Sequence, residues 1–118
     1  MKRKSSLYIK DIIDAITKIE EFIKGITYQE FVNDDKTSSA VIRKIEIIGE
    51  AVKHISEDVR NRFTEIPWSS MAKMRDKIIH FYHRVDYEVV WKTAKEDLPT
   101  LKTRLQEIYS MLEQQEKK

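Results

Sequence analysis

Between Trp68 and Arg84 the chain reads WSSMAKMRDKIIHFYHR, a stretch that holds two of the three histidines of the protein. Its apolar residues recur at the three- and four-residue spacing of an α-helix, so we predict one helix over 68–84. One side of that helix would be apolar, with Met71, Met74, Ile78 and Tyr82. An arc of about 120° on the opposite side would gather the ionisable side chains: Asp76, Lys77, His80, His83 and Arg84, with Arg75 at its edge. The predicted helix therefore has a packed face and a polar face.

The polar face has two interpretations. A charged face on a surface helix is most often simply solvated. Asp76 and His80, however, are spaced i, i+4, so the carboxylate could orient the imidazole. The combination of arginine, lysine, histidine and aspartate also suits phosphate chemistry, because arginine binds a phosphate through two parallel hydrogen bonds and histidine exchanges protons near neutral pH. The residue types favour a phosphate site, and a solvated face stays open.

A motif and several further blocks carry a family resemblance. Arg75, His80 and Tyr82 fit the pattern RxxxxHxY. Further blocks follow in order along the chain: Asp35–Ala51, Ile66–Trp68, Val85–Asp86 and Trp91–Pro99. With these blocks, which extend over nearly the whole chain, the sequence resembles the HEPN superfamily and in particular the HepT toxins. RxxxxH alone is a weak signal, whereas the ordered set of blocks is fairly specific.

The resemblance implies the activity of a metal-independent ribonuclease, the toxin of a toxin–antitoxin system, with RNA as substrate and no cofactor. His80 would be the general base or acid for attack of a ribose 2′-hydroxyl on the adjacent phosphate. Arg75 would hold that phosphate and stabilise its developing charge, and Asp76 would orient a neighbour. Further RNA or phosphate contacts are expected from Lys77, His83 and Arg84.

The resemblance also implies a protein partner. A minimal nucleotidyltransferase (MNT) would act as the antitoxin by adding AMP to Tyr82. On the predicted helix Tyr82 lies roughly 20° from Arg75, two turns further along. A phosphate and a base attached there would block RNA at Arg75 by charge and by volume.

Helical geometry predicts a homodimer. Arg75 and His80 are five residues apart, which separates them by about 140° around a single helix. One copy of the helix therefore does not direct both side chains at one point. Two copies facing each other across a two-fold axis would supply both residues to one cleft, as in the composite sites of HEPN dimers.

Composition limits the fold and the setting. At 118 residues the chain suits one domain over 1–118, and two glycines and two prolines leave few turns. This predicts an all-α protein, since 41% hydrophobic and 36% charged residues suit long amphipathic helices. A net charge of +2 is too small for broad capture of nucleic acid, so any basic patch must be local. The absence of cysteine, of a signal peptide and of a span-length apolar segment predicts a cytoplasmic protein without a membrane partner.

The apolar stripes divide the chain into an up-and-down-like helical bundle with four main helices and short connecting helices. Ser5 or Ser6 would cap the first helix, and the second long helix would begin at Thr37 or Ser38. Before it, Thr27 and Glu30 have the spacing of a capping box, which would start a short helix. Gly49, inside the second long helix, predicts a close approach of another backbone. In the last helix the stripe from Tyr87 to Leu112 keeps its phase through Pro99, which predicts one kinked helix. The polar tail from about 113 should fray.

Three other functions stay open. A noncatalytic partner subunit of a nucleotidyltransferase would use Arg75 and His80 only to bind nucleotide or substrate. A metal site from Asp76, His80 and His83 has suitable helical spacing, but three borderline ligands make it a weaker hypothesis. DNA binding is weaker still, because acidic residues are interleaved with the basic ones. Glu50 and His54 have no assigned role; we expect a solvated glutamate and a surface histidine.

Overall fold

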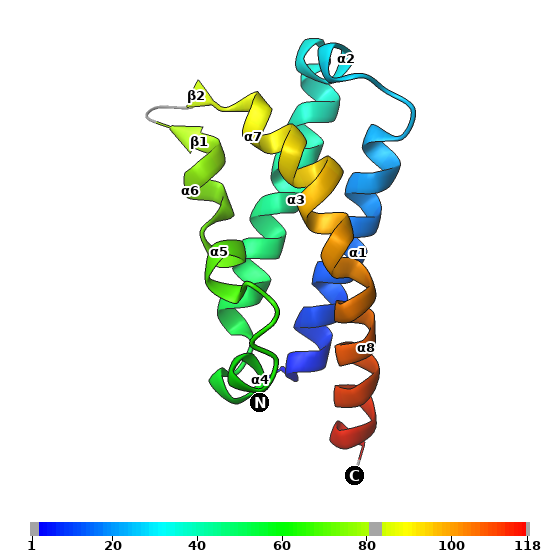
Figure 1. The fold of residues 1–118 in the computed structure, drawn as a ribbon, viewed down its shortest axis with the longest axis vertical. Coiled ribbons are helices and arrows are strands. Elements are labelled where there is room, and N and C mark those ends of the chain that lie inside the picture. The colour runs from blue at the N-terminus through cyan, green and yellow to red at the C-terminus, as the bar shows by residue number, and fades with distance from the viewer. Residues whose placement is uncertain (1–2, 81–83, 118) are drawn as a thin grey trace.

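The computed structural model confirms an all-α bundle (Figure 1). It describes residues 3–80 and 84–117, with His80 described in its backbone alone. The helices are α1 (Ser5–Ile23), α2 (Tyr28–Asn33), α3 (Asp35–His54), α4 (Glu57–Arg62), α5 (Trp68–Ala72), α6 (Met74–Ile78), α7 (Tyr87–Lys92), the π-helical η1 (Thr93–Asp97) and α8 (Leu98–Glu116). The strands β1 (Ile79–His80) and β2 (Arg84–Val85) form a two-stranded antiparallel ladder. In Figure 1, α1, α3, α5–α6 and α7–α8 run alternately up and down the bundle.

The long helices bury the predicted apolar stripes. In α1, Ile9, Ile12, Ile16 and Ile19 are fully buried, and α3 and α8 contribute comparable stripes to the same core. Burial of one such side chain stabilises the fold by about 1.5–3 kcal/mol, so the buried stripes of α1, α3 and α8 stabilise the packing of these helices. Within the described part of the chain, none of the helices has the length and apolar character that crossing a bilayer requires.

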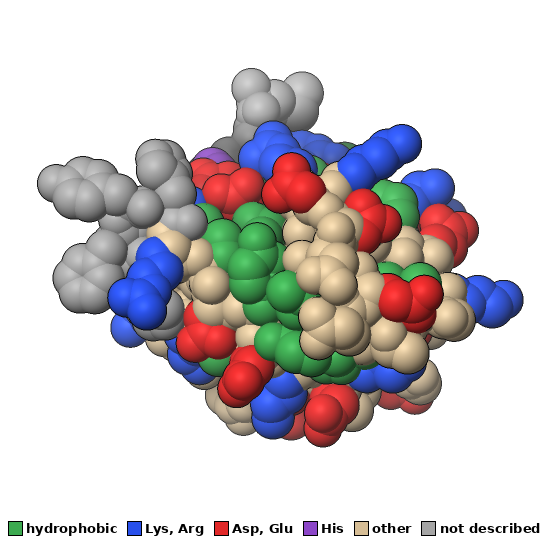
Figure 2. Space-filling view, turned by 90° about the horizontal axis from the view of Figure 1, so that it is seen from above, with side chains coloured by type: hydrophobic (Ala, Val, Ile, Leu, Met, Phe, Trp, Pro, Cys, Tyr) green, Lys and Arg blue, Asp and Glu red, His purple; other side chains and the backbone are tan. Residues whose placement is uncertain are grey.

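Aromatic side chains close the core between α2 and α7. The ring of Phe31 lies 5.1 Å from that of Trp91 and 6.4 Å from that of Tyr87, measured between centroids. Tyr28 packs its edge against Trp91. Figure 2 shows the end of the bundle that is at the top of Figure 1. Apolar side chains gather near the middle of this end, with charged side chains around them.

Capping explains where the N-terminal helices begin. The capping box is confirmed, since Glu30 N–H donates to Thr27 Oγ1 and Thr27 N–H donates to the Glu30 carboxylate. The predicted cap of the first helix and the predicted start of the second long helix are wrong. Helix α1 begins at Ser5 without a side-chain cap, and α3 begins at Asp35 because Asp34 accepts from Thr37 N–H at 3.2 Å. Aspartate is the better cap because its charge also suits the helix N-terminus.

The predicted helix over 68–84 is wrong in its extent. It is interrupted at Lys73, between α5 and α6, and it ends at Ile78. Beyond that point Ile79 pairs with Val85 and His80 pairs with Arg84 across the ladder. The residues from Ile78 to Val85 are mostly β-branched or aromatic, which favours extended backbone over helix. Apolar periodicity alone did not detect this change of conformation.

The last helix is continuous, as predicted. α7, η1 and α8 follow one another without a loop, and Figure 1 shows a change of direction where they join. Leu98 N–H donates to the Thr93 carbonyl, five residues back, which is the π-helical pattern. The wider turn precedes Pro99, whose ring would clash with a carbonyl of a regular α-turn. The helix runs to Glu116, past the position where we expected fraying, and Ser6 N–H and Arg62 bind its end at Glu116 and Gln115.

Gly49 lies where α3 meets α5, and the predicted close approach is confirmed. A Cβ atom at Gly49 would lie 3.3 Å from the Met71 carbonyl oxygen and 3.4 Å from that of Ala72. These are backbone atoms, which cannot turn aside as a flexible side chain would. The absence of a side chain on α3 therefore sets how close α5 and α6 come to it.

We predict that Gly49→Leu lowers the free energy of unfolding by about 1–3 kcal/mol, because a branched side chain forces the two backbones apart. Gly49→Ala is the matched control. Alanine gains about 1 kcal/mol in helix propensity over glycine. This gain opposes the cost of placing one added carbon, its Cβ, in tight contact with the carbonyls of α5. Urea denaturation of the three proteins measures the difference, and a Leu variant as stable as the Ala variant would contradict the close approach.

Candidate functional site

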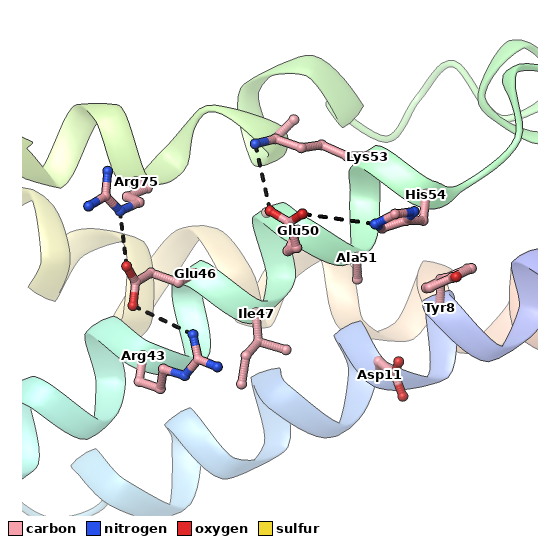
Figure 3. A pocket seen from close by; sticks show the side chains of 12 residues that line it. Tyr8, Asp11, Arg43, Glu46, Ile47, Glu50, Ala51, Lys53, His54 and Arg75 are labelled. Atoms are coloured by element: carbon pink, nitrogen blue, oxygen red, sulfur yellow. Dashed lines mark hydrogen bonds and ion pairs between the residues drawn. The ribbon is translucent and has the colours of Figure 1, made fainter.

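Arg75, the first residue of the RxxxxHxY motif, forms a side-chain hydrogen bond with another described residue, Glu46. Arg75 lies on α6, and its side chain is 60% exposed. Its Nε donates to Oε2 of Glu46 at 3.0 Å, across from α6 to α3. Figure 3 shows this contact at one end of a pocket. The arginine side chain is thus held through Nε on one side and remains largely exposed.

Glu46 lies between two arginines. Its second oxygen, Oε1, is 3.9 Å from Nη1 of Arg43, one turn earlier on α3. The Glu46 side chain is 28% exposed, far less than either arginine. Among the described residues the terminal nitrogens of Arg75 make no hydrogen bond, so they keep the paired donors with which arginine binds phosphate.

The pocket beside Arg75, which we call the Arg75 groove, has a volume of about 500 Å³. It is bounded by α1, α3 and the α5–α6 segment. Its lining consists of Tyr8, Asp11, Arg43, Glu46, Ile47, Gly49, Glu50, Ala51, Lys53, His54, Ala72 and Arg75. Its three cations, Arg43, Lys53 and Arg75, are matched in number by three carboxylates. The groove therefore suits a ligand bound at few charged points.

At the end of the groove away from Arg75, an aromatic pair lies at the surface (Figure 3). The rings of Tyr8 and His54 are stacked, with centroids 5.2 Å apart and 17° between their planes. Glu50 lies 3.9 Å from His54 and 3.7 Å from Lys53. The side chains of His54 and Glu50 are 56% and 67% exposed, so His54 is a surface residue and Glu50 a solvated one, as expected. Both line the groove.

A backbone hydrogen bond links the turn that carries Arg75 to the residue before His80. Ile79 N–H donates to the Arg75 carbonyl at the end of α6, and His80 follows directly in β1. Asp86 N–H donates to the Ile78 carbonyl at 2.7 Å, which closes the segment 78–86 at its base. The backbone of His80 and that of Arg84 are paired in the ladder above this closure.

The other predicted site residues are only partly brought together. The side chains of Asp76 and Lys77 are exposed on α6, and Arg84 is exposed on β2. Asp76 makes no side-chain hydrogen bond or ion pair with any described residue, so the structure shows no neighbour that it orients. The predictions for Tyr82, His83 and the side chain of His80 lie outside the described residues.

The single helix expected over 68–84 does not form, which changes the relation between the predicted site residues. Because α6 ends at Ile78, Asp76 and His80 are not an i, i+4 helical pair, and the common polar arc does not exist. The 140° separation of Arg75 and His80 fails for the same reason. The metal hypothesis loses its helical spacing, and no group of three metal-ligating side chains occurs in the described part of the structure.

Sequence reasoning missed the connection of Glu46 to Arg75. The sequence places Glu46 and Arg43 on one side of the second long helix, because they are three residues apart. Nothing local, however, links residue 46 to residue 75. Only the packing of α3 against α5 and α6 brings these side chains together.

Comparisons with known proteins agree on one family. The family model described as "Ribonuclease HepT-like" matches residues 12–108. The chain is 51% identical to "Probable ribonuclease HepT" of Thermococcus cleftensis, over 92% of this chain and 98% of that protein. Two proteins of Methanocaldococcus jannaschii, named "Putative RNase MJ0125" and "Putative RNase MJ1216", are 42% and 41% identical over 96% and 95% of this chain and 97% and 93% of theirs. No solved structure matches.

Proposed function

The chain belongs to the ribonuclease HepT-like family, and from this premise we propose that it is a metal-independent endoribonuclease with Arg75 and His80 as its catalytic pair. The observation that carries the proposal is the state of Arg75. Its guanidinium is anchored through Nε, its side chain is largely exposed, and its two terminal nitrogens bind none of the described residues. The ribonuclease names of the relatives support RNA as the substrate.

The proposed reaction is an internal transfer of the phosphate. The 2′-oxygen of the ribose attacks the adjacent phosphorus while the bond from phosphorus to the 5′-oxygen breaks. The products are a 2′,3′-cyclic phosphate and a free 5′-hydroxyl. The 2′-oxygen loses one proton and the leaving 5′-oxygen gains one. His80 carries out one of these two transfers, as base or as acid, and water exchanges the other proton. Arg75 binds two oxygens of the phosphate and stabilises the negative charge that grows on them.

Other residues would assist this reaction from the exposed surface. Lys77 and Arg84 are exposed on α6 and β2, close along the chain to the proposed pair, and would bind neighbouring phosphates. We propose the same for His83. Asp76 remains a proposed polar neighbour of the pair, although no described side chain contacts it.

We propose that the active form is a homodimer with a composite site. The family resemblance supports this proposal. The 140° separation of Arg75 and His80 does not, because α6 ends at Ile78 and the two residues do not share a helix. Arg75 is exposed on the surface of one chain, so a second chain could bring its own His80 to the same phosphate. The pair would then be completed by symmetry.

The biological role that we propose is that of a cytoplasmic toxin neutralised by an MNT-type nucleotidyltransferase. The partner would transfer AMP from ATP to the hydroxyl of Tyr82, with release of pyrophosphate. The added phosphate would be attracted to the free donors of Arg75 and would compete with RNA there. The alternative is a noncatalytic subunit that binds nucleotide for such an enzyme.

We predict that the wild-type protein cleaves RNA in the presence of EDTA, and that Arg75→Ala and His80→Ala each lower the rate by about 10²–10⁴-fold. Arg104→Ala is the matched control for Arg75, because it also removes an arginine whose Nε binds a glutamate. Thermal unfolding checks that each variant is folded. RNA binding without cleavage by the wild type would favour the noncatalytic alternative.

A composite site predicts complementation between inactive variants. Arg75→Ala and His80→Ala chains, mixed under conditions of subunit exchange, should regain about one quarter of the wild-type rate. Half of the dimers would be mixed, and each of these holds one intact Arg–His pair. Each variant mixed with itself is the control, and light scattering should give twice the mass of the chain. Dimers that exchange subunits yet stay inactive would show that each site uses a single chain.

For regulation, we predict that Tyr82→Phe keeps ribonuclease activity but escapes silencing by the partner nucleotidyltransferase with ATP and magnesium. Phenylalanine lacks the hydroxyl that accepts AMP. Intact-mass spectrometry after incubation reads the modification directly, and Tyr87→Phe is the matched control. Addition of AMP to the Tyr82→Phe protein would place the modification at another residue.

A further inference from the structure

Glu46 is the described side chain that fixes Arg75. Its Oε2 accepts from Arg75 Nε at 3.0 Å, and its Oε1 lies 3.9 Å from Arg43. We propose that Glu46 is a positioning residue, which holds the Arg75 guanidinium so that its two terminal nitrogens face the scissile phosphate of RNA. This inference rests on the proposed function, because it assigns Glu46 a role in that reaction.

Glu46 contacts Nε of Arg75, and the choice of this atom leaves the terminal nitrogens for another ligand. A guanidinium carries five N–H donors in a rigid plane, so a bond to Nε fixes the direction of the remaining four. Those four belong to Nη1 and Nη2, the nitrogens that bind phosphate oxygens in pairs. A carboxylate on the terminal nitrogens would instead compete with the phosphate. The observed contact therefore leaves the phosphate-binding edge of Arg75 available.

Glu46 is itself held in place from two directions. Arg43 lies at one oxygen and leaves the other for Arg75, so a cation faces each side of the carboxylate (Figure 3). Its neighbours Ile45 and Ile48 on α3 are fully buried, which fixes this part of the helix. Gly49, one turn after Glu46, allows the backbone of α5 to approach α3. These constraints direct a partly buried carboxylate toward an exposed arginine.

Two other roles for Glu46 make different predictions. As a purely structural ion pair, Glu46 would add little to stability and nothing to activity, because exposed pairs contribute weakly. As an autoinhibitory group, it would withdraw Arg75 from RNA, and its removal would raise activity. A positioning role alone requires that activity falls while the fold is kept.

The experiment compares Glu46→Ala and Glu46→Gln with the wild type by steady-state RNA cleavage in EDTA. We expect Glu46→Ala to lower kcat by roughly 10- to 100-fold with a smaller change in KM, since a misplaced group loses transition-state contacts most. Glu46→Gln should recover part of this loss, because its amide oxygen can still accept from Nε. Glu65→Ala is the matched control, since it removes a carboxylate from Nε of Arg104, 2.7 Å away, outside the groove. We expect that control to keep the wild-type kcat.

A double mutant tests whether Glu46 acts through Arg75. In the Arg75→Ala background, Glu46→Ala should cause no further loss, because the residue that it positions is gone. An equal loss in both backgrounds would overturn the proposal. So would a Glu46→Ala variant with wild-type or higher kcat.

A spectroscopic measurement separates this proposal from the proposed function. In ¹H–¹⁵N NMR spectra the Nε–H of Arg75 should exchange slowly with water in the wild type, and this protection should be lost in Glu46→Ala but kept in Glu65→Ala. If the protein cleaves no RNA yet shows this pattern, the proposed function fails and the anchoring of Arg75 stands. If it cleaves RNA through Arg75 but Nε–H is unprotected, the positioning role fails alone.

Discussion

The contact between the backbones of α3 and α5 at Gly49 determines where the candidate site lies. A Cβ atom there would be 3.3 Å from the Met71 carbonyl, so a glycine is the residue that permits the observed spacing. α6 follows α5 after a single interrupting residue, and Arg75 lies one residue into it. Its distance from Glu46 on α3 is therefore set by the same approach. A packing requirement in the core thus becomes a geometric requirement at the surface.

The end of α6 at Ile78 separates the two parts of the RxxxxHxY motif. Arg75 lies on a helix that packs against α3, whereas His80 lies in extended backbone that pairs with Arg84. The hydrogen bond from Asp86 N–H to the Ile78 carbonyl closes this segment where α6 ends and α7 begins. The arginine is consequently fixed by the bundle, while the histidine belongs to a segment that the bundle holds at its two ends. Such a division suits a site in which one group binds phosphate and the other transfers protons.

Local charge pairing explains how a nearly neutral protein can present one effective cation. The net charge is only +2, and many arginines and lysines among the described residues, such as Arg3, Lys10 and Arg104, form ion pairs with carboxylates. Such exposed pairs contribute little to stability. At Arg75 the pairing has a different consequence, because it occupies Nε and leaves the terminal nitrogens free of described partners. Whether a cation can bind RNA therefore depends on which of its atoms are already paired, and the net charge of the chain does not show this.

The sequence by itself determined the features that depend on neighbouring residues. The stripes of α1, α3 and α8, the capping box at Thr27 and Glu30, and the continuity of the last helix through Pro99 all follow from spacings within a few residues. The family motif likewise predicts Arg75 and His80 as site residues from their order alone, and this stays a prediction. Tertiary structure decided the rest. Whether Ile79 continues a helix or enters a strand depends on its pairing with Val85, and Glu46 meets Arg75 across 29 positions of sequence only because α3 and α6 pack together. Periodicity reports which face of an element is buried, but it contains no information on which other element buries it.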